Sequence, residues 1–247
     1  MMRKRRDSPT TLRGQTKEAL TSMVVIRGTR GSTVVEIDLK DVEKELRSHG
    51  FAVRGGYLHS LNYAAIRQGM WKPAPQKAGA VVSKLRPMNQ EQAPSRTLSA
   101  VHGLDAQPLH TDGAHLRKMP DVIVLCAASP SPTGTTIWKL GRDYPSALRN
   151  GVFTVRGNDS SFLAHAYANQ RLRFDPVCMS PADQLAREAK AFLENTRDRA
   201  HTHTWSAGRT LLFIDNRQTL HGREAVADAV DVESRVIERS AYYLEPR

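Results

Sequence analysis

The chain has 247 residues, of which 40% are hydrophobic and 25% charged. This length fits one sizeable domain with a real core, and the composition is that of an ordinary folded protein rather than a disordered one. No stretch approaches the roughly 20 consecutive apolar residues that a membrane helix needs, so a membrane-spanning protein is not expected. With 36 basic and 25 acidic residues, the formal net charge is +11.

The excess of positive charge has more than one interpretation. It suits a nucleic-acid-binding protein, but it also suits a basic surface or a basic pocket for anionic small molecules. Residues 3–6 are all Arg or Lys, and residues 1–20 are expected to form a flexible basic leader before a single domain over residues 21–247. Aromatic residues make up only 6% of the chain, which is poor for stacking on bases. We therefore expect a small-molecule partner rather than nucleic acid or a membrane, and the oligomeric state stays open.

The cysteines and the N-terminus bear on the cellular compartment. Cys126 and Cys178 are the only cysteines, and neither belongs to a C-x-x-C pair. We expect both to stay reduced in a cytoplasm. No apolar segment follows the basic run at residues 3–6, so this run does not indicate a secretory signal.

The N-terminal part of the chain is predicted to combine short strands, helices and loops. Two strands are predicted at residues 23–27 and 33–37. Asp38 is expected to cap a helix that runs to about Ser48 and stops at Gly50, with Leu39 and Leu46 on its buried face. The further predicted elements are a strand over residues 51–53, a helix over 61–68 and a strand over 80–85, with Pro- and Gln-rich loops at 69–79 and 87–99.

From residue 101 onward, short apolar runs alternate with turn residues, a pattern that favours a β-sandwich or barrel. One helix interrupts the pattern. Ser180 and Pro181 are its predicted cap and first-turn proline, and its buried stripe runs from Leu185 to Leu193. The predicted strands are residues 122–127, 135–140, 152–155, 171–174, 210–214 and 235–244.

Two potential metal ligands, His110 and Asp112, stand one residue apart. On a strand, side chains two positions apart leave the same face, so this imidazole and this carboxylate would project together. A His-x-Asp pair alone is common by chance, and an exposed turn is the alternative. An apolar strand near residue 211 runs into a polar turn, and the next strand presents His221 before Gly222. Two histidines and one carboxylate on one face leave positions open for a co-substrate and dioxygen, as in non-haem iron(II) oxygenases.

Arg235 and Arg239 form a possible anion site. On a strand they share a face with the apolar Ile237. Two arginines among apolar residues are costly unless an anion meets them, and a guanidinium binds a carboxylate as a planar fork. Exposed strand arginines are the alternative, but the preceding metal pattern favours a site for a dicarboxylate co-substrate.

Because these residues occur in this order along the sequence, the chain resembles the taurine dioxygenase and clavaminate synthase-like family of iron(II)/2-oxoglutarate-dependent oxygenases. The resemblance covers about residues 80–247. It rests on the segments 109–112, 134–138, 214–217 and 220–223 together with the arginine pair, a combination that is specific although no single segment is.

The resemblance implies a fold that is mainly β with flanking helices, a double-stranded β-helix or jelly roll. It implies that iron(II) is held by His110, Asp112 and His221 and that 2-oxoglutarate chelates the metal. A carboxylate at position 112 argues against a halogenation reaction, because the halogenating relatives have a small residue at this position.

The resemblance also implies partners for the far carboxylate of 2-oxoglutarate. Arg235 would pair with it, assisted by the hydroxyl of Thr136, and Arg239 would lie near the co-substrate or the substrate. His221 and Arg235 are 235 − 221 = 14 positions apart, which suits the clavaminate synthase-like branch better than taurine dioxygenase itself. This departure leaves the choice between the two arginines open.

The implied reaction oxidises 2-oxoglutarate to succinate and carbon dioxide with O2 and hydroxylates a small polar metabolite, amino-acid-like or a natural-product intermediate. Desaturation or ring formation stays open. Gln107, His115 and Arg173 are candidate substrate contacts, although Arg173 would equally pair with Asp175. A nucleic-acid-acting oxygenase and a catalytically silent binding protein of the same fold are the alternatives.

Overall fold

The computed structural model describes residues 25–26, 34–35, 37–75 and 80–245, and the chain divides into two compact units, Met1–Glu36 and Ile37–Arg247. In the first unit, β1 (Val25–Ile26) pairs antiparallel with β2 (Val34–Val35), as predicted. The predicted leader, residues 1–20, lies outside the described residues. Over the parts that are described, no helix has the length and apolar character needed to cross a membrane.

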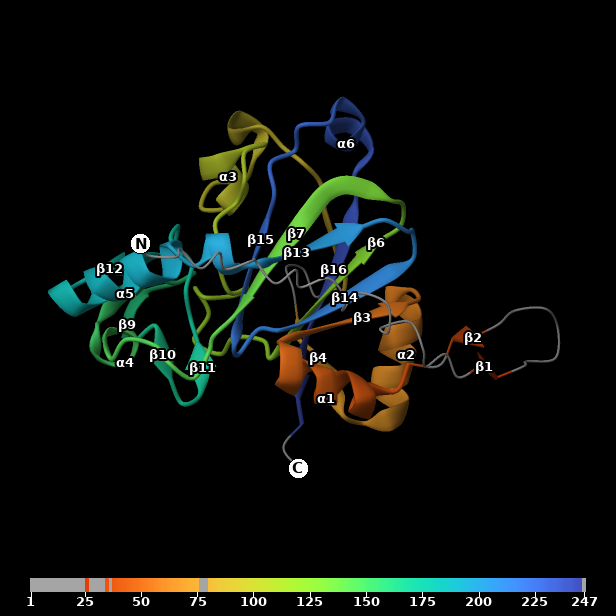
Figure 1. Cartoon of the computed structure of the whole chain (residues 1–247), viewed down its shortest axis with the longest axis horizontal. Coiled ribbons are helices and arrows are strands. Elements are labelled where there is room, and N and C mark those ends of the chain that lie inside the picture. Colours follow the sequence, from red (N-terminus) through yellow and green to blue (C-terminus); the bar gives the residue numbers. More distant parts are fainter. Residues whose placement is uncertain (1–24, 27–33, 36, 76–79, 246–247) are drawn as a thin grey trace, which may run out of the picture. The chain divides into compact units, whose positions relative to one another are not determined.

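The second unit is built on a six-stranded antiparallel sheet (Figure 1). Its strand order is β3-β14-β6-β16-β4, and β5 also pairs with β16. Every residue of β6 is buried, because strands flank it and other elements cover both of its faces. The bounds are β3 (Phe51–Gly55), β4 (Trp71–Pro73), β5 (Ser83–Leu85), β6 (Val122–Ala127), β14 (Thr210–Asp215) and β16 (Ile237–Leu244).

Two helices, α1 (Leu39–His49) and α2 (Leu58–Gln68), cover one face of this sheet (Figure 1). The predicted cap and stop of α1 are confirmed: the Asp38 carboxylate accepts hydrogen bonds from two backbone N–H groups, and Gly50 takes the left-handed conformation with φ 84°. The apolar side of α1 packs with α2 and with the outward side chains of β6 and β14 in one core cluster. Apolar spacing and cap chemistry therefore sufficed to place this helix.

A second antiparallel sheet, ordered β13-β7-β15, faces the inner side of the large sheet. Ile137 of β7 and Trp205 of β13 pack there against apolar residues of β6, β14 and β16. Two antiparallel sheets enclosing a core in this way form the predicted jelly roll. The bounds are β7 (Ser131–Lys139), β13 (His201–Trp205) and β15 (Thr219–Arg223).

A third layer, with its own core, packs beyond the small sheet. Ser180 and Pro181 do not begin the helix as predicted but lie on β12, where they pair with β8, and Asp183 caps α5 instead by accepting from the N–H of Ala186. The proline is tolerated because β12 is an edge strand. The elements here are α4 (Ala147–Asn150), β8 (Phe153–Arg156), β9 (Ser161–Ala164), β10 (Tyr167–Ala168), β11 (Arg171–Leu172), β12 (Met179–Pro181) and α5 (Gln184–Glu194).

The remaining elements are short and lie in the connections. The strand predicted over residues 80–85 is limited to β5, and the one predicted over 171–174 is limited to β11. The short helices are η2 (Gln90–Gln92), α3 (Leu98–His102), η3 (Arg197–Arg199) and α6 (Ala229–Ser234).

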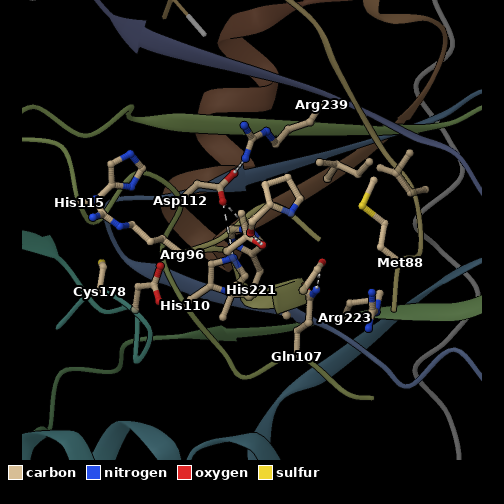
Figure 2. Close-up of a pocket in the computed structure, with 18 of the residues that line it drawn as sticks. Met88, Arg96, Gln107, His110, Asp112, His115, Cys178, His221, Arg223 and Arg239 are labelled. Atoms are coloured by element: carbon tan, nitrogen blue, oxygen red, sulfur yellow. Dashed lines mark hydrogen bonds and ion pairs between the residues drawn. The ribbon is translucent and has the colours of Figure 1, made fainter. Parts of the chain in front are cut away.

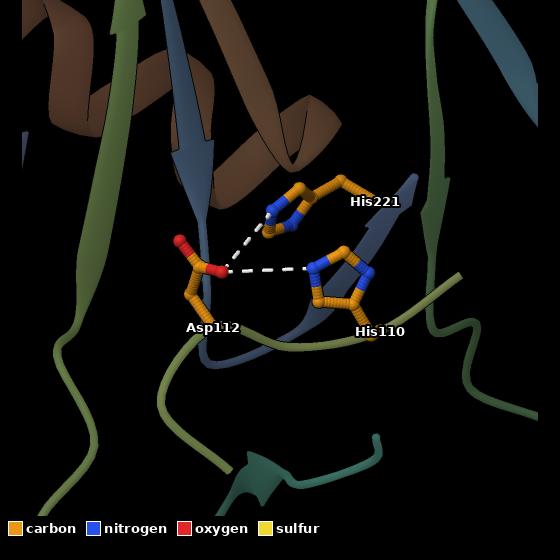
Figure 3. Close-up of side chains that lie close together, drawn as sticks. All are labelled: His110, Asp112 and His221. Carbon is orange, nitrogen blue, oxygen red and sulfur yellow. Dashed lines mark ion pairs between the residues drawn. The ribbon is translucent and has the colours of Figure 1, made fainter. Parts of the chain in front are cut away.

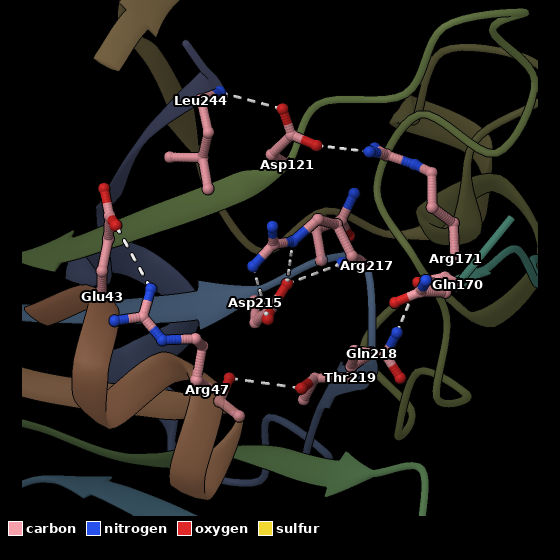
Figure 4. Close-up of polar contacts among 12 residues, drawn as sticks. Glu43, Arg47, Asp121, Gln170, Arg171, Asp215, Arg217, Gln218, Thr219 and Leu244 are labelled. Carbon is pink, nitrogen blue, oxygen red and sulfur yellow. Dashed lines mark hydrogen bonds and ion pairs between the residues drawn. The ribbon is translucent and has the colours of Figure 1, made fainter. Parts of the chain in front are cut away.

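Buried polar contacts fix the turn between β14 and β15 (Figure 4). Asp215 is 2% exposed, and its carboxylate accepts hydrogen bonds from Arg217 at 2.8 and 3.0 Å. Thr219 donates to the carbonyl oxygen of Gly50 at 3.2 Å. Nearby, Asp121 accepts from the N–H of Leu244 at 2.9 Å. Because both ends of the turn are held, the start of β15 has a defined position.

Candidate metal centre and pocket

Three side chains converge on one point (Figure 3). The Nε2 atoms of His110 and His221 lie 3.6 and 3.8 Å from Oδ1 of Asp112, and all three ligand atoms lie within 4.8 Å of one another. Ligands bound at right angles to a metal at about 2.1 Å are roughly 3 Å apart, so small side-chain adjustments would close them on one cation. Within the described residues, this is the one group of three His, Cys, Asp or Glu side chains suited to a metal.

The backbone brings the two histidines together directly. His110 and His221 form a two-way antiparallel bridge, each N–H donating to the other's carbonyl oxygen at 2.9 Å. The expectation that His110 and Asp112 share a strand is wrong in detail: beyond the bridge the chain enters a turn, and Gly113 adopts φ 72°. Gly222 allows the close approach, because a Cβ there would lie 2.7 Å from the carbonyl oxygen of Gln107.

The surroundings of the two imidazole rings shift their pKa values in opposite directions. The Nδ1 atom of His110 lies 3.0 Å from the carbonyl oxygen of Pro108, an acceptor that favours the neutral tautomer with its proton on Nδ1 and Nε2 toward the metal position. Burial lowers the pKa of His110, but the carboxylate of Asp112 outweighs it and raises this pKa, so a metal would compete with a proton for Nε2. Burial, with the neighbouring His110, lowers the pKa of His221 to about 3, although Asp112 opposes the shift. The ring of His221 is therefore neutral at physiological pH and able to coordinate a cation.

Arg239 holds the carboxylate of Asp112, and Asn216 holds its backbone. Arg239 Nη1 donates to Oδ2 of Asp112 at 3.0 Å, which leaves Oδ1 directed at the imidazoles. Burial alone would raise the pKa of Asp112, but the charge of Arg239 and the ring of His110 outweigh it and keep this pKa well below its usual range. The completely buried Asn216 accepts from the N–H of Asp112 and donates to its carbonyl oxygen, both at 2.9 Å.

Asn216 is a residue that sequence reasoning missed. Its segment was noted as a motif, but no role was assigned to the amide. The signal was present, because an amide at the end of a strand with an apolar middle is expected to be buried and then needs partners of its own. A third hydrogen bond, from Nδ2 to the carbonyl oxygen of Pro120 at 3.0 Å, completes its pairing.

A cavity of about 670 Å³ opens above the three ligands (Figure 2). Of the candidate substrate contacts, Gln107 and His115 line it. Arg173 does not: it donates to the carbonyl oxygens of Ala114 and, at 2.7 Å, of Leu116, so it neither reaches the cavity nor pairs with Asp175. Its role is to brace the turn that follows Asp112.

Thr135, and not Thr136, lies at the cavity wall. Successive side chains of β7 point to opposite faces of the strand. Thr135 therefore shares the inner face with Ile137, and Thr136 shares the outer face with Trp138, which packs on the third layer. The hydroxyl of Thr135 accepts from the indole N–H of Trp205 at 3.2 Å. The expected position of Thr136 beside the co-substrate therefore differs from the structure by one residue.

Arg235 also lines the cavity, but from a different element than expected. It ends helix α6 rather than lying on β16, and it is only 8% exposed. Its Nε donates to the hydroxyl of Ser131 at 3.1 Å, and that hydroxyl donates to the buried carboxylate of Asp231 at 2.7 Å. Burial lowers the pKa of Arg235 to about 10, against the opposing charge of Asp231, so the guanidinium stays charged at neutral pH.

Comparison with known proteins gives structural matches only. No family model and no curated protein matches the sequence. A solved structure of an asparagine oxygenase with Fe(II), 3-hydroxyasparagine and succinate matches with a TM-score of 0.63 at 20% identity, covering 83% of this chain and 78% of that one. The non-haem iron oxygenase OrfP with Fe and α-ketoglutaric acid also matches at 0.63 and 20%, covering 84% and 80%. The chain therefore has the jelly-roll fold of non-haem iron oxygenases.

Proposed function

We propose that this protein is an iron(II)- and 2-oxoglutarate-dependent dioxygenase that hydroxylates a small polar metabolite. The observation that carries the proposal is the convergence of His110, Asp112 and His221 beneath a large cavity. Bound there, iron(II) would supply the oxidation of 2-oxoglutarate by dioxygen to succinate and carbon dioxide, coupled to hydroxylation of a substrate C–H bond. The donor set fits this metal, because two imidazoles and one carboxylate on one face leave the remaining positions to the reactants.

The surrounding residues keep the three ligands ready. The carbonyl oxygen of Pro108 lies beside Nδ1 of His110, and Arg239 fixes the direction of the Asp112 carboxylate. Asn216 holds the backbone of Asp112. Such supporting hydrogen bonds orient metal ligands and raise metal affinity. Because hydrogen bonds already orient these side chains in the protein alone, the arrangement supports a dedicated metal site rather than a chance cluster.

Arg235 is our choice for the partner of the far carboxylate of 2-oxoglutarate. It is buried, it lines the cavity, and its Nε is held by Ser131. Arg239 is already engaged with Asp112. A desolvated guanidinium binds a carboxylate strongly and with fixed geometry. The hydroxyl of Thr135, on the same wall, is the second group we assign to the co-substrate.

The substrate class follows from the cavity and from the proteins of like fold. A volume of about 670 Å³ holds 2-oxoglutarate and leaves room for a second small molecule. The structures of like fold were solved with 3-hydroxyasparagine and with (3S)-hydroxy-L-Arg, both small polar molecules. We place the reaction in the cytoplasm, where the free thiols of Cys126 and Cys178 stay reduced.

Anaerobic spectroscopy tests the proposal. Iron(II) and 2-oxoglutarate added together should give a weak visible charge-transfer band, and His221→Ala should abolish it. Once air is admitted, the wild-type protein should slowly form succinate without any substrate. A wild-type protein that stays colourless and forms no succinate would overturn the assignment, whereas a band without succinate would indicate a binding protein of the same fold.

A further inference from the structure

The cavity wall carries far more positive than negative charge. Six arginines, Lys84 and two aspartates line it. Asp112 is a metal ligand in the proposed function, and Oδ1 of Asp175 already accepts the N–H of Val177 at 2.8 Å. The arginines are Arg86, Arg96, Arg156, Arg223, Arg235 and Arg239.

Four of the six arginines already have partners in the protein. Arg235 bonds Ser131, and Arg239 bonds Asp112. Arg223 donates to the carbonyl oxygens of Gly103 and Asp105, and Arg156 donates to that of Val177. The guanidinium groups of Arg86 and Arg96 differ from these four, because they make no hydrogen bond or ion pair with the described part of the chain. Two arginines at the cavity are therefore available to a ligand, and Lys84 adds a third basic side chain to the same wall.

The backbone of Arg96 adopts a conformation that is unfavourable for a residue with a side chain. Arg96 has φ 66°, a left-handed conformation that costs a residue with a side chain about 1–2 kcal/mol. The turn that it makes keeps the whole segment from 94 to 99 at the cavity wall. Figure 2 shows Arg96 beside His115 on one side of the cavity, with Met88 and Arg223 on the other. The conformation thus holds a solvent-exposed cation at the cavity wall.

Charge also disfavours a substrate with a cationic end. An ammonium or guanidinium group would meet several arginines, with Asp175 as the one carboxylate of the lining besides the proposed metal ligand Asp112. Like charges within a few ångströms repel, whereas a guanidinium binds an oxyanion through paired N–H donors. The two kinds of substrate should therefore differ strongly in affinity.

We infer that the substrate is a small oxyanion, which carries a phosphate, sulfate or carboxylate at the end away from the iron. Arg86 and Arg96 hold that group, and the C–H bond to be oxidised lies toward His110 and His221. This inference rests on the proposed function for the position of the metal. It goes beyond that function by excluding cationic amino acids such as arginine as the preferred substrate.

Matched pairs of ligands test the inference. Calorimetry on the full chain, with and without iron(II) and 2-oxoglutarate under argon, would compare O-phospho-L-serine with L-serine and glycerol 3-phosphate with glycerol. L-Arginine and L-asparagine complete the set. The test variant is Arg86→Gln/Arg96→Gln, and the control is Arg142→Gln/Arg187→Gln, which removes the same charge from exposed positions outside the cavity lining.

We expect each phosphorylated ligand to bind at least about tenfold more tightly than its neutral counterpart. The Arg86→Gln/Arg96→Gln variant should lose this preference, while the control keeps it and both variants retain the charge-transfer band. Three results would each overturn the inference: no preference in the wild type, an equal preference in both variants, or tighter binding of L-arginine than of the phosphorylated ligands. Absence of the band with a phosphate preference intact would count against the proposed function alone.

Discussion

The two arginines behind the metal centre should have separable effects on ligand binding. Arg235 is buried and held through Ser131, whereas Arg239 bonds the outer oxygen of Asp112. Replacing Arg235 with Gln should therefore weaken 2-oxoglutarate binding and leave the metal in place. Replacing Arg239 with Gln should weaken metal binding first.

The structure sets the expected size of the Arg235 effect. Arg235 is 8% exposed, so its pairing with a carboxylate is largely desolvated. Removing one partner of such a charge pair costs about 2–5 kcal/mol, and a central value of about 3 kcal/mol corresponds to roughly 150-fold weaker binding. For Arg239→Gln, loss of a group that supports a metal ligand corresponds to about 10- to 100-fold weaker metal binding.

Two titrations measure these effects. The charge-transfer band followed against 2-oxoglutarate at saturating iron(II) gives the co-substrate Kd, and competition with a chromophoric chelator gives the metal Kd. Thermal unfolding of both variants verifies that each is folded. If Arg239→Gln lost 2-oxoglutarate affinity while Arg235→Gln bound it normally, the assignment of the two arginines would be reversed and the argument from burial refuted.

Three further predictions concern residues around the site. Asn216→Ala should lower the free energy of unfolding by about 3 kcal/mol and metal affinity at least tenfold, because three hydrogen bonds of a buried amide are lost; denaturant unfolding and metal titration measure both. Thr135→Val should raise the 2-oxoglutarate Kd about tenfold through loss of a charge-assisted hydrogen bond, and the same change at position 136 should leave it unaltered. Burial raises the pKa of Cys178 to about 12, with Asp175 adding to the shift, and that of Cys126 to about 11. A raised thiol pKa leaves less thiolate at a given pH, so at pH 8 only about one Cys178 side chain in 10⁴ is ionised. Iodoacetamide should therefore label this cysteine slowly in the folded protein and fast in denaturant, which mass spectrometry would measure.

The three candidate metal ligands could be proposed from sequence, because metal binding restricts the residue types and because two of the three residues lie close together in the chain. His110 and Asp112 are separated by one residue, and His221 directly precedes a glycine whose missing side chain admits the other ligand segment. The helix α1 was equally accessible, since Asp38 and Gly50 mark its ends by local rules. Local chemistry thus predicted both the helix and a set of three side chains that the structure brings together, without knowledge of the fold.

The errors arose where a neighbour in space, rather than in sequence, decides the outcome. Ser180 and Pro181 have the local pattern of a helix start, but pairing with β8 makes them a strand. Thr135 and Thr136 are adjacent and chemically identical, so only the inward face of β7 distinguishes them, and a shift of one residue exchanges the two faces. Asn216 meets Asp112 across 104 positions of sequence, a contact that no local pattern contains.

Chemistry and specificity come from different parts of this fold. The ligands are set by β15 and by a turn that Asn216 and Arg173 brace, and proteins at 20% identity share the underlying sheets. The cations that we assign to the substrate, Arg86 and Arg96, lie instead on the irregular segment between β5 and α3. Loops change sequence and conformation more freely than the strands that carry them. One sheet framework can therefore keep the same oxidation while its loops select a different substrate, and the charge of that segment is the better guide to the substrate of this chain.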